Sequence, residues 1–180
     1  ALWDSKLFLQ QNPDFFINVN VSAKQLERPD FCRVVLELLD KTEFPVRHLC
    51  LEITERCRSL PVSVINERMA VLRGYGIKFA MDDFGTGSSS SAMALEMLID
   101  EIKIDMSFIR KILVNKKNKA IVQSMVDFAN AANIKSCLEG VENKALEDYL
   151  RTVGATWFQG YYYSKPVGAD ELEILLSAKK

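Results

Sequence analysis

Short apolar runs alternate with helical patterns along the chain, and this alternation predicts six β/α units. Apolar residues spaced three and four apart predict helices, whereas mostly apolar runs bounded by turn residues predict buried strands. The expected strands cover residues 14–21, 48–54, 77–82, 100–105, 134–139 and 155–159. The expected helices cover residues 1–11, 31–42, 61–74, a segment ending near 98, 107–113, 117–132, 144–153 and 169–178. Asp30 and Asn143 precede two of these helices and are expected to cap them.

Consecutive β/α units favour an α/β fold with a parallel sheet, because each helix returns the chain to the start of the next strand. A closed (β/α) barrel has eight strands, so six strands in 180 residues predict a TIM-like barrel that lacks its first two strands in this chain. A doubly wound open sheet is the alternative, and it would require the strand order to reverse. No linker or low-complexity tract divides residues 1–180, which are expected to form one domain. Because Ala1 lies inside an expected helix, we expect a fragment of a longer protein.

Polar side chains stand at or near the end of each expected strand. They are Asn20, Glu52, the pair Asp82 and Asp83, Lys103, Glu139 and Gln159. A single acidic residue in such a position is usually a turn former or a helix cap, and a lysine between two isoleucines can simply extend its ammonium to the rim. Repetition at six strand ends favours a shared site instead, because parallel strands gather their carboxyl ends on one side of a barrel.

The acidic and amide side chains in this pattern offer only oxygen donors, which hard cations such as Mg²⁺ or Mn²⁺ prefer. Adjacent aspartates suit a pair of metal ions roughly 3.5–4 Å apart, an arrangement that drives in-line displacement at phosphorus. In such a site Lys103 would orient the attacking water or neutralise a phosphoryl oxygen. Glu139 would bind a metal or act as general base. The sequence therefore predicts a metal-dependent active site.

Composition excludes several other classes of function. The single histidine, His48, precedes a strand at the end opposite the predicted site, so it is expected to be structural or solvated rather than part of a catalytic triad or a zinc site. A net charge of −1 gives no general basic field for a DNA or RNA polymer, and no apolar run approaches the ~20 residues of a membrane span. Four cysteines without Cys-x-x-Cys spacing indicate reduced thiols in a cytoplasmic protein.

Six ordered motifs resemble the EAL-domain family, the cyclic di-GMP phosphodiesterases of bacteria. The matching segments are residues 19–26 (VNVSAKQL), 51–55 (LEITE), 82–87 (DDFGTG), 102–105 (IKID), 139–142 (EGVE) and 159–161 (QGY) followed by 164–166 (SKP). The resemblance covers essentially the whole chain, in order and at spacings similar to those of the family. It implies a barrel hydrolase of bacterial signal transduction that opens cyclic di-GMP to linear pGpG with two Mg²⁺ or Mn²⁺ ions.

The resemblance also implies a role for each site residue. Asn20, Glu52 and Asp82 would bind the first metal, Asp82 would bridge to the second, and Asp83 would bind that second ion. Lys103 would hold the catalytic water, Glu139 would be base or ligand, and Gln159 would complete the pocket. Glu55 would brace the loop that starts at Asp82 and couple it to dimerisation. Further implied partners are a second copy of the chain and an upstream sensor or regulatory domain, in the bacterial cytoplasm, with membrane anchoring of the full-length protein left open.

Some features depart from the family pattern. The glutamate, alanine and leucine that name the family are absent, as are an arginine that follows them and the first two strands. Ser88 stands where the family usually has an aromatic residue, and Asn143 where it usually has threonine. Three explanations stay open: a missing N-terminal piece of an active enzyme, a shortened chain with an open barrel seam, or a degenerate protein. The alternatives to catalysis are an inactive cyclic di-GMP receptor and an EAL-like protein-interaction module.

Overall fold

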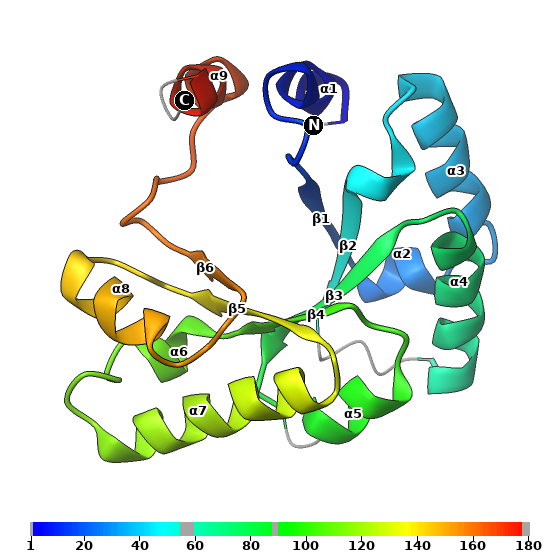
Figure 1. Cartoon of the computed structure of the whole chain (residues 1–180). Coiled ribbons are helices and arrows are strands. Elements are labelled where there is room, and N and C mark those ends of the chain that lie inside the picture. Colours follow the sequence, from blue (N-terminus) through cyan, green and yellow to red (C-terminus); the bar gives the residue numbers. More distant parts are fainter. Residues whose placement is uncertain (1, 55–59, 88–89, 178–180) are drawn as a thin grey trace.

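The computed structural model describes residues 2–54, 60–87 and 90–177, and it is a curled sheet of six parallel strands with helices on its outer side (Figure 1). The strands are β1 (Ile17–Val21), β2 (Leu49–Thr54), β3 (Lys78–Phe84), β4 (Glu101–Ile104), β5 (Lys135–Glu139) and β6 (Trp157–Gln159). They pair in the order of the sequence, from β1 to β6, with every neighbouring pair parallel. A doubly wound sheet would reverse this order. The predicted TIM-like barrel of six β/α units is confirmed.

The helices follow the strands as the sequence pattern predicted. They are α1 (Leu2–Gln11), α2 (Ala23–Glu27), α3 (Phe31–Thr42), α4 (Val62–Gly74), α5 (Ser90–Glu96), α6 (Met106–Ile109), α7 (Lys116–Ala131), α8 (Lys144–Arg151) and α9 (Ala169–Ser177), with a 3₁₀ turn η1 at Val46–His48. Among the α-helices of the described residues, only α2 was not predicted. It is a five-residue helix held by a capping box, in which the Ser22 side chain accepts from Gln25 N and the Gln25 side chain accepts from Ser22 N.

Alternate residues of each strand face opposite sides of the sheet, and this alternation separates the core from the site. On β2, Leu51 and Ile53 belong to the apolar core that the helices cover, whereas Glu52 between them faces the other side. On β4, Ile102 and Ile104 likewise belong to the apolar core, and Lys103 between them faces the other side. The concave inner side of the sheet therefore carries the polar residues.

The sequence predicted helix caps at Asn143 and Asp30, and the structure confirms a side-chain cap bond only at Asn143. Asn143 caps α8 as predicted, because its Oδ1 accepts a hydrogen bond of 2.9 Å from Leu146 N. The prediction for Asp30 is wrong in part: it precedes α3 but makes no side-chain cap bond, because its carboxylate pairs with Arg28 and Arg33 instead.

His48 has the structural role expected of it. Its Nδ1 lies 2.7 Å from the carbonyl oxygen of Phe15, and its Nε2 accepts a 2.9 Å hydrogen bond from Arg47. These contacts tie η1 to the turn before β1, at the amino ends of the strands and away from the predicted site.

The two edge strands of the open sheet, β1 and β6, approach each other at their amino ends. The rings of Phe16 and Trp157 lie 5.3 Å apart, and α1 packs beside α9 across the same seam (Figure 1).

The described cysteines, Cys32, Cys50 and Cys137, are free thiols as expected. No helix within the described part of the chain has the length and apolarity needed to cross a membrane.

Candidate active site

Lys103 stands at the centre of three carboxylates on the inner side of the sheet. Its Nζ lies 2.8 Å from Glu139 Oε1, 2.9 Å from Glu52 Oε1 and 3.3 Å from Asp82 Oδ1. The Lys103 and Glu52 side chains are each only 5% exposed, so these ion pairs are largely shielded from water. Four strands, β2 to β5, thus contribute one charged side chain each to a single cluster.

Strand register explains why residues so far apart in sequence meet. Side chains on one face of a parallel sheet recur every second residue, and Glu52 pairs across the strands with Ala80, two residues before Asp82. Lys103 pairs with Cys137, two residues before Glu139. The cluster is therefore built near the carboxyl ends of the strands, where barrel enzymes hold their active sites.

Each of the three carboxylates gives one oxygen to Lys103 and keeps another for which the described residues provide no hydrogen-bond donor. Three carboxylates against one ammonium also leave an excess of negative charge. An incomplete acidic cluster of this kind attracts a further cation or a ligand rich in donors.

Burial and charge pairing set the protonation of the cluster. Burial by itself would lower the pKa of Lys103, but the ion pairs with Glu139 and Glu52 outweigh it and raise that pKa above its usual value. Burial raises the pKa of Glu139, an effect that Lys103 partly offsets. Lys103 is therefore a permanent cation at neutral pH, and Glu139 is a stronger base than an exposed glutamate.

The donor chemistry of the cluster fits a hard divalent cation such as Mg²⁺ or Mn²⁺. The available ligand atoms of the cluster are oxygens, and the buried amide oxygen of Asn18, beside Glu52, accepts no hydrogen bond from any described residue. Within the described ranges no three Asp, Glu, His or Cys residues stand close enough together to form a metal cluster by themselves, and Lys103 stands between the three carboxylates. A cation would bind through the oxygens that Lys103 leaves available.

The other predicted site residues are less tightly gathered. Asn20 pairs in register with Glu52 but its side chain is exposed. Asp83 has a left-handed backbone (φ 54°) at an irregularity in β3, and such a bulge can turn a side chain away from strict alternation. Gln159 pairs in register with Glu139, and both line a cavity of about 220 Å³. Glu55 lies outside the described residues.

Asn18 was missed by the sequence analysis. Its Nδ2 donates a 2.7 Å hydrogen bond to Glu52 Oε1, the oxygen that Lys103 also contacts. The sequence spacing could have indicated Asn18, because it lies two residues before Asn20 and so faces the same side of β1.

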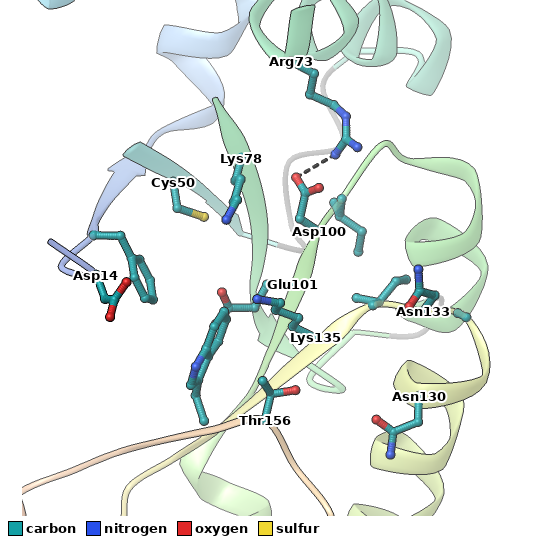
Figure 2. A pocket seen from close by; sticks show the side chains of 15 residues that line it. Asp14, Cys50, Arg73, Lys78, Asp100, Glu101, Asn130, Asn133, Lys135 and Thr156 are labelled. Atoms are coloured by element: carbon teal, nitrogen blue, oxygen red, sulfur yellow. Dashed lines mark ion pairs between the residues drawn. The ribbon is translucent and has the colours of Figure 1, made fainter. Parts of the chain in front are cut away.

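A cavity of about 810 Å³ lies elsewhere, at the amino ends of the strands (Figure 2). It is lined by Lys78, Glu101 and Lys135 among others, and an ion pair of 2.6 Å between Arg73 and Asp100 borders it. Glu101 is 4% exposed and forms no hydrogen bond or ion pair with any described residue, and burial raises its pKa to about 7. The amino ends of barrel strands usually serve stability rather than catalysis.

The fold and the cluster define a (β/α)-barrel protein with an acidic, lysine-centred site at the carboxyl ends of its strands. The chain belongs to the EAL domain family, which matches residues 3–166.

Curated relatives carry the same domain. The chain is 36% identical over 170 residues to the probable cyclic di-GMP phosphodiesterase PdeG of Escherichia coli, and 32% identical over 166 residues to the cyclic di-GMP phosphodiesterase PdeA of Borreliella burgdorferi. Each match covers 92% of this chain but only 33% and 25% of the relative. The chain thus spans about a quarter to a third of the length of these two relatives.

Solved structures agree with the fold. The EAL enzyme Bd1971, in its form with cAMP and cyclic di-GMP bound, superposes with a TM-score of 0.93 at 32% identity. That match covers 98% of this chain and 49% of the other. The arrangement of strands and helices is therefore that of the EAL fold over nearly the whole chain.

Proposed function

We propose that this chain forms the six C-terminal β/α units of a phosphodiesterase that hydrolyses cyclic di-GMP to linear pGpG. The observation that carries the proposal is the contact of one buried lysine with three carboxylates from three other strands, in a chain of the EAL domain family. Two similar proteins bear the name cyclic di-GMP phosphodiesterase, one of them as probable, and cyclic di-GMP is bound in a similar solved structure.

The proposed active form holds Mg²⁺ or Mn²⁺. Glu52, Asp82 and Asn20 would hold one ion, with Asp82 and Asp83 serving a second. Divalent cations at such a site polarise a phosphoryl oxygen and lower the pKa of water. The oxygens that Lys103 leaves available support this assignment.

We propose Glu139 as the general base. Burial raises its pKa, and a base with a pKa nearer neutrality accepts a proton more effectively at physiological pH. In the proposed reaction Glu139 takes a proton from the attacking water while the water oxygen bonds to phosphorus. The bond between that phosphorus and the 3′ oxygen of the neighbouring ribose breaks, the leaving 3′ oxygen takes up a proton from solvent, and the product is a linear dinucleotide with a 5′ phosphate and a free 3′ hydroxyl.

Lys103 is proposed to hold the three carboxylates in one arrangement and, once one of them binds a metal ion instead, to donate to the attacking water. A buried ammonium has three donors and a fixed charge, so it keeps three acidic side chains together that would otherwise repel one another. Gln159 shares the small cavity with Glu139 and would contact the substrate there. Glu55 is proposed to brace the loop after β3.

The proposal extends to the setting of the domain. We propose that it acts as a homodimer in the bacterial cytoplasm, next to a sensor or regulatory domain of a longer protein. Light scattering of the natural protein during size-exclusion chromatography measures its oligomeric state, and a monomer would contradict the dimer.

Incubation of the natural protein with cyclic di-GMP and Mn²⁺ tests the function directly. Chromatography should show pGpG accumulating, and EDTA should abolish it. Binding of cyclic di-GMP without metal and its release unchanged would indicate a receptor instead, and would contradict the enzymatic proposal.

A further inference from the structure

Asn18 and Lys103 converge on the same oxygen of Glu52. Asn18 Nδ2 lies 2.7 Å from Glu52 Oε1, and Lys103 Nζ lies 2.9 Å from it. The described residues provide no donor to Glu52 Oε2. The two donors thus saturate one oxygen of the carboxylate and leave the other one available.

The buried amide oxygen of Asn18 is destabilising, which a purely structural role would not explain. Its Oδ1 is buried and accepts no hydrogen bond from the described residues. A buried polar atom without a partner destabilises a fold, and replacing such a group by an apolar one of similar shape can be neutral or stabilising. The position is nevertheless occupied by an amide, whose useful contact is the hydrogen bond to Glu52.

Lys103 alone does not fix the orientation of Glu52. The ammonium is a compact charge shared among three carboxylates, so it does not by itself select which oxygen of Glu52 it contacts. A directional N–H donor from a neighbouring strand removes this freedom, because β1 and β2 are held in register by their backbone.

We propose that Asn18 is a positioning residue that orients Glu52 so that Oε2 faces the divalent cation. This inference rests on the proposed function, since it assumes that Glu52 binds the metal. Outer residues that orient a metal ligand typically contribute 10–100-fold to metal affinity or activity. Removal of the Asn18 amide should therefore weaken Mn²⁺ binding without weakening the fold.

The test compares the natural protein with its Asn18→Leu variant, which keeps the approximate shape and removes both the donor and the unpartnered acceptor. Electron paramagnetic resonance measures free Mn²⁺, and thermal unfolding is followed in the metal-free protein. We expect Mn²⁺ affinity to fall about 10-fold or more, with an unchanged or higher melting temperature. Asn130→Leu, on the exposed surface of α7, is the control and should leave Mn²⁺ affinity unchanged.

The possible outcomes distinguish a failure of the role proposed for Asn18 from a failure of the proposed metal-dependent function. Equal Mn²⁺ affinity in the Asn18→Leu variant and the unmodified natural protein would overturn the role of Asn18 alone. A fall in melting temperature together with unchanged affinity would also overturn it, because Asn18 would then be structural. If Asn18→Leu does not fold, Asn18→Ala is measured against the same criteria. Absence of Mn²⁺ binding by the unmodified natural protein would overturn the metal site itself, and the role of Asn18 with it.

Discussion

The ammonium of Lys103 lies 2.8 Å from Glu139 Oε1, and this contact joins β4 to β5 at the centre of the site. Because the same ammonium also contacts Glu52 and Asp82, a single side chain forms ion pairs with acids from three strands. The site and the stability of the barrel therefore depend on one residue.

Replacement of Lys103 by methionine should destabilise the chain strongly. Removing one partner of a buried ion pair leaves uncompensated charge and typically costs about 3–5 kcal/mol. Urea unfolding at pH 8 should show this loss, and the loss should be smaller at pH 5 because the carboxylates can then take up protons. Lys116→Met, on the exposed first turn of α7, is the control. An unchanged unfolding midpoint for Lys103→Met would contradict the role given to the ammonium.

Gly160→Ala should disturb the loop behind the site. A Cβ at Gly160 would lie 2.1 Å from the carbonyl oxygen and 2.3 Å from the nitrogen of Val141, so the backbone that follows Glu139 must move. Such overpacking costs about 1–3 kcal/mol. Gly168→Ala meets no atom within 4 Å and should change stability by less than about 0.5 kcal/mol. Equal unfolding free energies for the two variants would contradict this packing.

Glu101 should make stability depend on pH. Its folded-state pKa is raised from 4.5 to about 7, so the folded protein holds a proton that the unfolded chain has already released. The stability contribution of Glu101 therefore falls as pH rises from about 4.5 to about 7 and is constant above. At about 1.36 kcal/mol per pKa unit, the loss is on the order of 3 kcal/mol. Glu101→Gln should remove this pH-dependent loss. The variant should therefore be more stable than the natural protein at pH 8 but not at pH 4. A pH-independent difference between the two proteins would show that Glu101 ionises normally.

Asn143 should be replaceable by a residue of the same capping type. Its Oδ1 accepts from Leu146 N at the start of α8, and a threonine hydroxyl can make an equivalent bond. Asn143→Thr should therefore be nearly neutral, whereas Asn143→Ala should cost about 1 kcal/mol. Thermal unfolding of the two variants measures the difference, and equal melting temperatures would argue against a capping role.

Much of the architecture could be predicted from the sequence because the spacing of apolar residues marks the strands and the long helices. The strand bounds differ from those predicted by a few residues, and β3 continues through Asp83 because a bulge lets the chain change direction without leaving the sheet. The helix α2 was missed because five residues are too few to show a helical period, and only its capping box between Ser22 and Gln25 marked it.

The site was harder to predict than the fold. Strand ends pointed to Glu52, Asp82, Lys103 and Glu139, which do meet, because carboxyl ends of parallel strands converge. Asn18 escaped attention because it lies inside a strand rather than at its end, and its contact with Glu52 depends on register that one sequence does not reveal. The metal and catalytic roles of the four residues that meet stay predictions, as do those of Asn20, Glu55, Asp83 and Gln159.

The rate of cyclic di-GMP hydrolysis by the natural protein and by its Glu139→Gln variant, measured with Mn²⁺ by the appearance of pGpG, tests the central claim most directly. Loss of a general base typically lowers the rate 10²–10⁴-fold, and we expect a decrease in this range with the fold intact by circular dichroism. Production of pGpG at the same rate by both proteins, or no pGpG from the natural protein, would contradict the account.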